Sequence, residues 1–125
     1  MIRWFEKKRS LSLFITLAIA VGIFAVSSRS FDSPVSGGGL IPILYHLAAF
    51  FFLAIFLFIS FVGGRKIWIA PFCFVVAVLY GISDEIHQYF VPGRFMSFGD
   101  VFIDAVGISF ALLIYSISLE LRSIQ

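Results

Sequence analysis

The sequence has little charge, and it has a single cysteine. Only 13% of its 125 residues are charged and 61% are hydrophobic, whereas a soluble domain carries about 25% charged residues. A chain with so few polar side chains has no means of covering its surface in water, so the lipid bilayer must be its solvent. The net charge of +2 is too small to indicate a nucleic-acid partner. The lone Cys73 excludes an internal disulfide, and its place in an apolar run indicates small apolar packing.

Motifs for several common chemistries are also missing. The sequence has no phosphate-binding loop, no dinucleotide fingerprint and no nucleophile motif. Its two histidines, His46 and His87, lie far apart and show no tight ligand spacing such as HExxH. We therefore predict no cofactor and no metal. A metal site formed by these histidines and nearby carboxylates is an alternative, but no sequence motif supports it.

Long apolar runs divide the chain into four segments, which predicts an all-α membrane protein built as one domain over residues 1–125. A spanning helix needs about 20 residues. Glycine and proline clusters separate the runs, at 37–39, 63–64 and 92–93. The third helix should continue through Asp84 and end before Pro92. The predicted bundle has four transmembrane helices, at 11–28, 40–62, 67–91 and 97–119.

The first apolar run has a second possible interpretation. A basic lead, an apolar stretch and the small residues at 25–28 are also typical of a cleaved signal peptide. The run is longer than the usual signal core of about 7–15 residues, so we interpret it as an uncleaved first span.

The distribution of basic residues predicts the orientation. Four spans place the N-terminus, the turn at 63–66 and the C-terminus on one side, with seven Lys and Arg residues against two, Arg29 and Arg94, on the other. Cytoplasmic loops carry the excess of Lys and Arg. We therefore predict a multi-pass protein of the cell membrane with cytoplasmic termini and an outward-facing stretch 84–104.

This stretch holds four of the seven carboxylates of the chain. Asp84 and Gln88 are spaced i, i+4 and share a helix face, whereas Glu85 points about 100° away. A carboxylate near a helix C-terminus is disfavoured by the helix dipole, so we predict that Arg94 pairs with Asp84, Glu85 or Asp100. The lesser alternative is that these groups simply face water and headgroups.

The start of the fourth helix carries two further carboxylates. The run Ser97-Phe98-Gly99-Asp100 fits a capping box, with Ser97 as N-cap and Asp100 as its acidic partner. Asp104 lies one turn deeper and forms a stripe with Gly107 and Ala111, small residues that let another helix approach. We predict that Asp104 faces the protein interior and meets the outer half of the second or third span. His46 lies at a similar depth in the second span.

The spacing of these polar residues resembles a known family. The pattern E-x-x-Q-x-x-x-P-G-R-x-x-S-x-x-D, from Glu85 to Asp100, is similar to the signature of the VanZ-like membrane proteins. His46 resembles the histidine of an early helix in that family. Members often carry a lysine where this chain has Ile43, and Asn where it has Asp104. The resemblance implies a multi-pass membrane protein, with a founding member tied to teicoplanin resistance, and it supplies no reaction.

These observations lead to a functional hypothesis with two alternatives. The leading one is a cell-envelope protein with an outward polar site that binds or modifies a lipid-linked, amphiphilic or anionic envelope molecule. Glu85 and Asp100 are its acid–base candidates and Arg94 its anion clamp, within a cluster that also contains His46, Asp84, Gln88 and Asp104. The alternatives are a non-enzymatic assembly or binding subunit, and a small proton-coupled carrier that uses Asp104.

Overall fold

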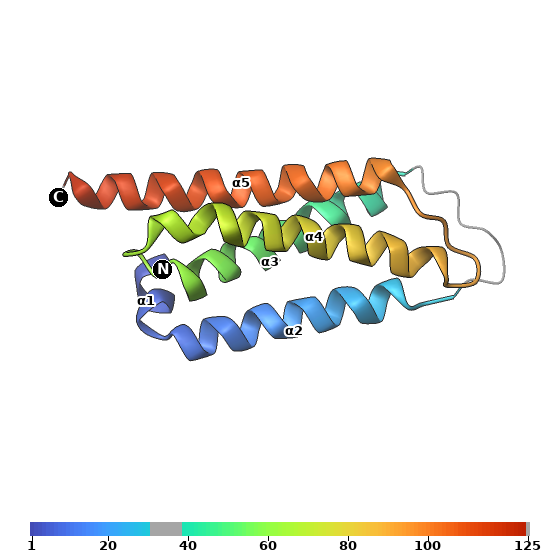
Figure 1. Cartoon of the computed structure of the whole chain (residues 1–125), viewed down its shortest axis with the longest axis horizontal. Coiled ribbons are helices and arrows are strands. Elements are labelled where there is room, and N and C mark those ends of the chain that lie inside the picture. The colour runs from blue at the N-terminus through green and yellow to red at the C-terminus, as the bar shows by residue number, and fades with distance from the viewer. Residues whose placement is uncertain (31–38, 125) are drawn as a thin grey trace.

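The computed structural model describes residues 1–30 and 39–124, and within these ranges it contains helices and no strand. The elements are α1 (Ile2–Lys7), α2 (Arg9–Ser27), α3 (Leu40–Phe61), the 3-10 turn η1 (Ile67–Ile69), α4 (Ala70–Tyr89) and α5 (Phe98–Ser123). The four long helices lie roughly side by side, and the short helix α1 crosses one end of the bundle (Figure 1).

The prediction of an all-α bundle is confirmed. Four of these helices are long and apolar enough to cross a membrane: α2, α3, η1 with α4, and α5. The helix of the third span ends at Tyr89, before Pro92 as expected, whereas α5 continues to Ser123 because no breaker follows 119. Most of the predicted loop between the first two spans lies at 31–38, outside the described residues.

The two ends of the bundle differ in what they hold. Both chain ends and the turn between α3 and η1 lie together at one end, which we name the terminal end (Figure 1). The connection between α4 and α5, residues 90–97, lies at the opposite end, which we name the loop end.

Helices α3 and α5 approach each other closely because α5 carries glycine at the crossing. A Cβ added to Gly107 would lie 2.6 Å from the carbonyl oxygen of Leu47, so only glycine fits there. Asp104 and Ala111, on the same stripe, are also buried. The prediction that this stripe faces protein is therefore confirmed.

The apolar core draws on all four long helices and extends along the bundle, from Val62 after α3 to Ile23 in the last turns of α2. Phe58 and Tyr115 are fully buried, and their rings stack with centroids 6.0 Å apart. Cys73 is buried in the same core as a free thiol, which confirms the prediction of small apolar packing.

Helix α1 was not predicted, because the first ten residues are mostly polar and basic. Ile2 and Phe5 nevertheless pack against the core, and the Phe5 ring meets Phe56 edge to face at 5.2 Å. Lys8 then leaves the helical region, with φ −110° and ψ 58°, and lets α2 start in a new direction. The i, i+3 spacing of Ile2 and Phe5 is the signal that predicts one buried face.

Candidate functional site

The loop end contains a group of polar side chains that are almost completely buried. Glu85 is 0%, Asp104 1%, and Asp84 and His46 each 4% exposed. Charged side chains are almost never fully buried unless they are paired. The partners of each side chain in this group therefore decide how its burial is stabilised. We name it the polar cluster; it consists of Ser27, His46, Asp84, Glu85, Gln88 and Asp104.

Helix α4 contributes Asp84 and Gln88 on one face, as their spacing predicts. The Nε2 of Gln88 donates to Oδ2 of Asp84 at 3.0 Å. The hydroxyl of Ser27, the last residue of α2, donates to the same oxygen at 2.8 Å. Ser27 was not predicted as a site residue, because at the end of an apolar run a serine has no distinguishing local signal.

Glu85 connects α4 to the start of α5. Its Oε2 accepts the backbone N–H of Ser97 at 2.9 Å, and its Oε1 accepts from Nε2 of Gln88 at 3.2 Å. Ser97 is the N-cap of α5, and its Oγ accepts the N–H of Asp100 at 3.2 Å. The capping prediction is therefore only half right, because Glu85 of another helix occupies the place expected for Asp100.

Arg94 reaches the polar cluster through an amide. Its Nε and Nη2 donate to Oε1 of Gln88 at 3.1 and 2.7 Å. Within the described residues, Asp84, Glu85 and Asp100 form no ion pair with Arg94, so the predicted direct pair is wrong. Gln88 stands between them because its NH₂ group faces the carboxylates while its oxygen faces the guanidinium.

The structure joins α3 to α5 through His46 and Asp104. Nδ1 of His46 lies 2.9 Å from Oδ1 of Asp104, a hydrogen-bond distance for an imidazole N–H and a carboxylate. A Cβ added to Gly81 of α4 would lie 3.2 Å from Oδ2 of Asp104. Asp104 thus meets both α3 and α4 and faces the interior, as predicted.

Two carboxylate oxygens of the polar cluster have no hydrogen-bond partner among the described residues. They are Oδ1 of Asp84 and Oδ2 of Asp104, and both are shielded from solvent. An unpaired buried polar atom carries a desolvation penalty of roughly 1–3 kcal/mol, and more for a charged group. The cluster is therefore short of donors or of positive charge.

The remaining predicted residues lie at the rim or outside. Arg94 and Asp100 are half-buried at the rim of the polar cluster. His87 is outside it, because its Nε2 lies 3.0 Å from Oγ of Ser28 and its ring stacks on Phe24. A joint metal site for both histidines is therefore not formed, whereas His46, Glu85 and Asp104 each place a ligand atom within 4.8 Å of the others.

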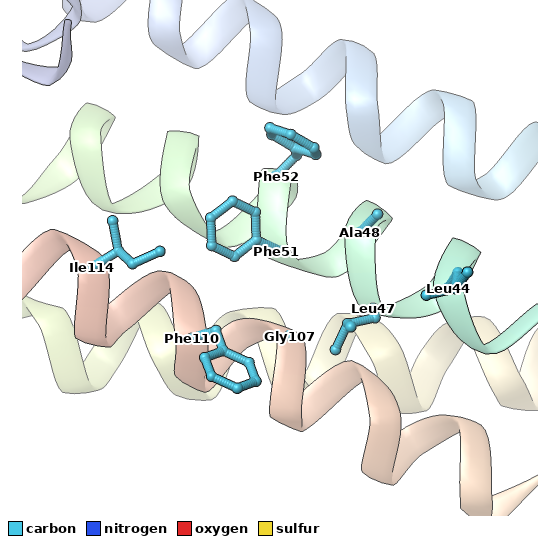
Figure 2. Close-up of a pocket in the computed structure, with 8 residues that line it drawn as sticks. All are labelled: Leu44, Leu47, Ala48, Phe51, Phe52, Gly107, Phe110 and Ile114. Carbon is cyan, nitrogen blue, oxygen red and sulfur yellow. The ribbon is translucent and has the colours of Figure 1, made fainter.

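An apolar hollow lies apart from the polar cluster. Figure 2 shows it on the surface of α3 and α5, where Phe110 and Ile114 of α5 face side chains of α3. Its volume is about 410 Å³. Among the described residues its lining is entirely apolar, so in a bilayer it suits contact with lipid tails. The lining consists of Leu44, Leu47, Ala48, Phe51, Phe52, Gly107, Phe110 and Ile114.

A model of the VanZ/LLP1 family matches residues 3–119 of this chain, a range that includes the whole polar cluster. A search of the curated proteins found no match to this chain, and neither did a search of the solved structures.

Proposed function

The chain belongs to the VanZ/LLP1 family, and we propose that it is a cell-membrane protein whose polar cluster faces outward and binds the headgroup of an amphiphilic cell-envelope molecule. The main support for this proposal is the burial of three carboxylates, Asp84, Glu85 and Asp104, at one end of a bundle of helices that are long and apolar enough to span a membrane. Ionisable residues inside a membrane are expensive, and they mark functional sites by default.

The proposed orientation rests on charge. The terminal end collects seven Lys and Arg residues, including Arg65, Lys66 and Arg122, against Arg29 and Arg94 at the other side. The positive-inside rule then supports a cytoplasmic terminal end and an outward loop end. The association of the family with resistance to teicoplanin, whose target lies outside the cytoplasmic membrane, agrees with this orientation.

The rim of the polar cluster supports an amphiphilic ligand. The guanidinium of Arg94 lies at this rim, where Gln88 holds it by two hydrogen bonds, and a guanidinium is a planar group that suits a phosphate or carboxylate. The surrounding connection carries exposed aromatic side chains: Phe90, Phe95 and Phe98 are 73%, 63% and 81% exposed. A headgroup bound by Arg94 would thus have apolar surface beside it for its chain.

A second candidate is a non-enzymatic assembly subunit, in which the polar cluster only specifies packing. Cross-helix hydrogen bonds favour this candidate, because Ser27 joins α2 to α4 and Glu85 joins α4 to α5. Buried polar groups have fixed the register of helices in some proteins. A proton-coupled carrier with Asp104 as the titrating group is the third candidate.

Native mass spectrometry of the purified protein tests the headgroup proposal. The wild type should retain an envelope amphiphile, and Arg94→Lys should lose it because an ammonium cannot reproduce the bidentate fork. Arg29→Lys is the matched control, since Arg29 is the other arginine of that side and is exposed. Ligand loss at normal protein abundance supports a binding site. Reduced abundance with unchanged ligand occupancy supports the packing role instead.

A further inference from the structure

The polar cluster has more buried negative charge than its partners offset. Asp84, Glu85 and Asp104 are at most 4% exposed. Within the described residues, the only ion pair among these three that is no longer than 4.0 Å joins Asp104 to His46. Asp84 and Glu85 receive hydrogen bonds from neutral donors. Buried charges are normally paired or bound to a metal.

The geometry adds a second, independent observation. His46, Glu85 and Asp104 come from α3, α4 and α5, and one ligand atom of each lies within 4.8 Å of the others. Oδ2 of Asp104 is buried and unpartnered, and it lies beside Gly81, one turn before Glu85 on α4. The oxygen therefore points toward the helix that carries Glu85, where a cation would satisfy it.

We propose that His46, Glu85 and Asp104 bind one divalent transition-metal cation in the outer half of the bundle. This inference rests on the proposed function, because the cation reaches the site from the outside only in the proposed orientation. The cation would offset the carboxylates and provide a positive centre deeper than Arg94. An anionic headgroup is otherwise poorly suited to a cluster with three carboxylates.

The donor set favours Zn²⁺ or Mn²⁺ over Mg²⁺ or Ca²⁺. Zn²⁺ is bound by imidazole nitrogen as well as by carboxylate oxygen, carboxylates also suit Mn²⁺, and a Zn²⁺ ion with three protein ligands keeps a fourth position open. Ligand atoms around tetrahedral Zn²⁺ lie about 3.3 Å apart, given bonds of ~2.0–2.1 Å. Small side-chain rotations from the present spacing of at most 4.8 Å would close the site. The open position would then accept a headgroup oxygen.

Neighbouring groups already hold one ligand in place. Glu85 receives a hydrogen bond on each oxygen, from Ser97 N–H and from Gln88. Each carboxylate oxygen has a second lone pair available for a cation. Partners of this kind orient metal ligands in known sites. Asp84 lies outside the proposed ligand set, because its Oδ2 accepts hydrogen bonds from Ser27 and Gln88.

The test uses the full chain in detergent, treated with a chelator and then titrated with Zn²⁺, Mn²⁺ or Mg²⁺. We expect one equivalent of Zn²⁺ or Mn²⁺ by calorimetry and elemental analysis, with a raised Tm, and a weaker response to Mg²⁺. His46→Gln and Glu85→Gln should each weaken binding at least about tenfold, the lower bound for disturbing even an outer partner of a metal ligand. His87→Gln is the matched control, because His87 lies outside the polar cluster, and it should bind as the wild type does.

Two results would overturn the metal site. One is the absence of both stoichiometric binding and a Tm shift in the wild type, a measurement that does not depend on the folding of any variant. The other is an equal loss of affinity in His87→Gln and His46→Gln. Retention of an Arg94-dependent amphiphile without metal would leave the proposed function intact while the metal site fails. Metal binding without any retained amphiphile would support the metal site and contradict the headgroup proposal.

Discussion

Glu85 of α4 accepts the backbone N–H of Ser97, the N-cap of α5, at 2.9 Å. A side chain buried in one helix therefore completes the cap of the next. This relationship explains why Glu85 is fully buried, and it links the integrity of the polar cluster to the start of α5.

The first prediction separates the two halves of this cap. Ser97→Ala removes only the hydroxyl that accepts from Asp100, so we expect a loss of about 1 kcal/mol in the free energy of unfolding. Glu85→Leu leaves the Ser97 N–H without its acceptor, and should cost roughly 1–3 kcal/mol. Denaturant unfolding in detergent measures both, with the exposed Ser83→Ala as control. A Glu85→Leu variant as stable as the control would contradict this role.

The second prediction concerns orientation. In a Cys73→Ser background, a cysteine at Phe95 should react with an impermeant reagent on intact cells, whereas one at Lys66 should not. Both side chains are exposed. The neighbouring Gly64 is unsuitable because its φ of 71° and its closeness to Glu6 would strain any side chain. The reverse labelling pattern would place the polar cluster on the cytoplasmic side.

The third prediction addresses the pair of His46 and Asp104. Asp104→Asn keeps a hydrogen-bond acceptor for His46 and should fold, whereas Asp104→Leu leaves a buried imidazole unpaired and should cost roughly 1–3 kcal/mol. If the protein is a proton-coupled carrier, Asp104→Asn should abolish transport because an amide does not titrate. Unfolding curves and a transport assay on both variants decide this. Full stability and function of both would make Asp104 a bystander.

The sequence predicted what depends on local composition. The spans follow from the length of apolar runs, and the inward position of Asp104 follows from its stripe with Gly107. The roles of Ser27 and Gln88 did not follow. The role of Ser27 depends on the end of α2 meeting α4, and the role of Gln88 depends on the orientation of its side-chain amide. Neither can be inferred from residue spacing within a single helix.

The terminal end offers a fourth prediction. The hydroxyl of Tyr115 accepts the N–H of Gly64 at 2.9 Å and donates to Oε1 of Glu6 at 2.9 Å, while Arg122 also binds Glu6. Tyr115→Phe removes both of its bonds and should lower the free energy of unfolding by roughly 1–3 kcal/mol.

Tyr45→Phe is the control for this change, because Tyr45 makes no hydrogen bond through its hydroxyl within the described part of the chain. Thermal unfolding of the two variants side by side measures the difference. Equal Tm values would show that the contact between α1, the turn and α5 adds no net stability.

The last prediction concerns the crossing of α3 and α5. Gly107→Ala places a Cβ 2.6 Å from the carbonyl oxygen of Leu47, closer than real Cβ contacts, so the two helices must separate. Overpacking of this kind typically costs about 1–3 kcal/mol. Because His46 and Asp104 lie on the same two helices, the separation should also weaken their contact.

Gly22→Ala is the matched control, since a Cβ there meets nothing within 4 Å and alanine favours a helix. Unfolding measurements should therefore show a loss for Gly107→Ala and none for Gly22→Ala. Equal stability would mean that α5 shifts along α3 at no cost and that glycine is not required at the crossing.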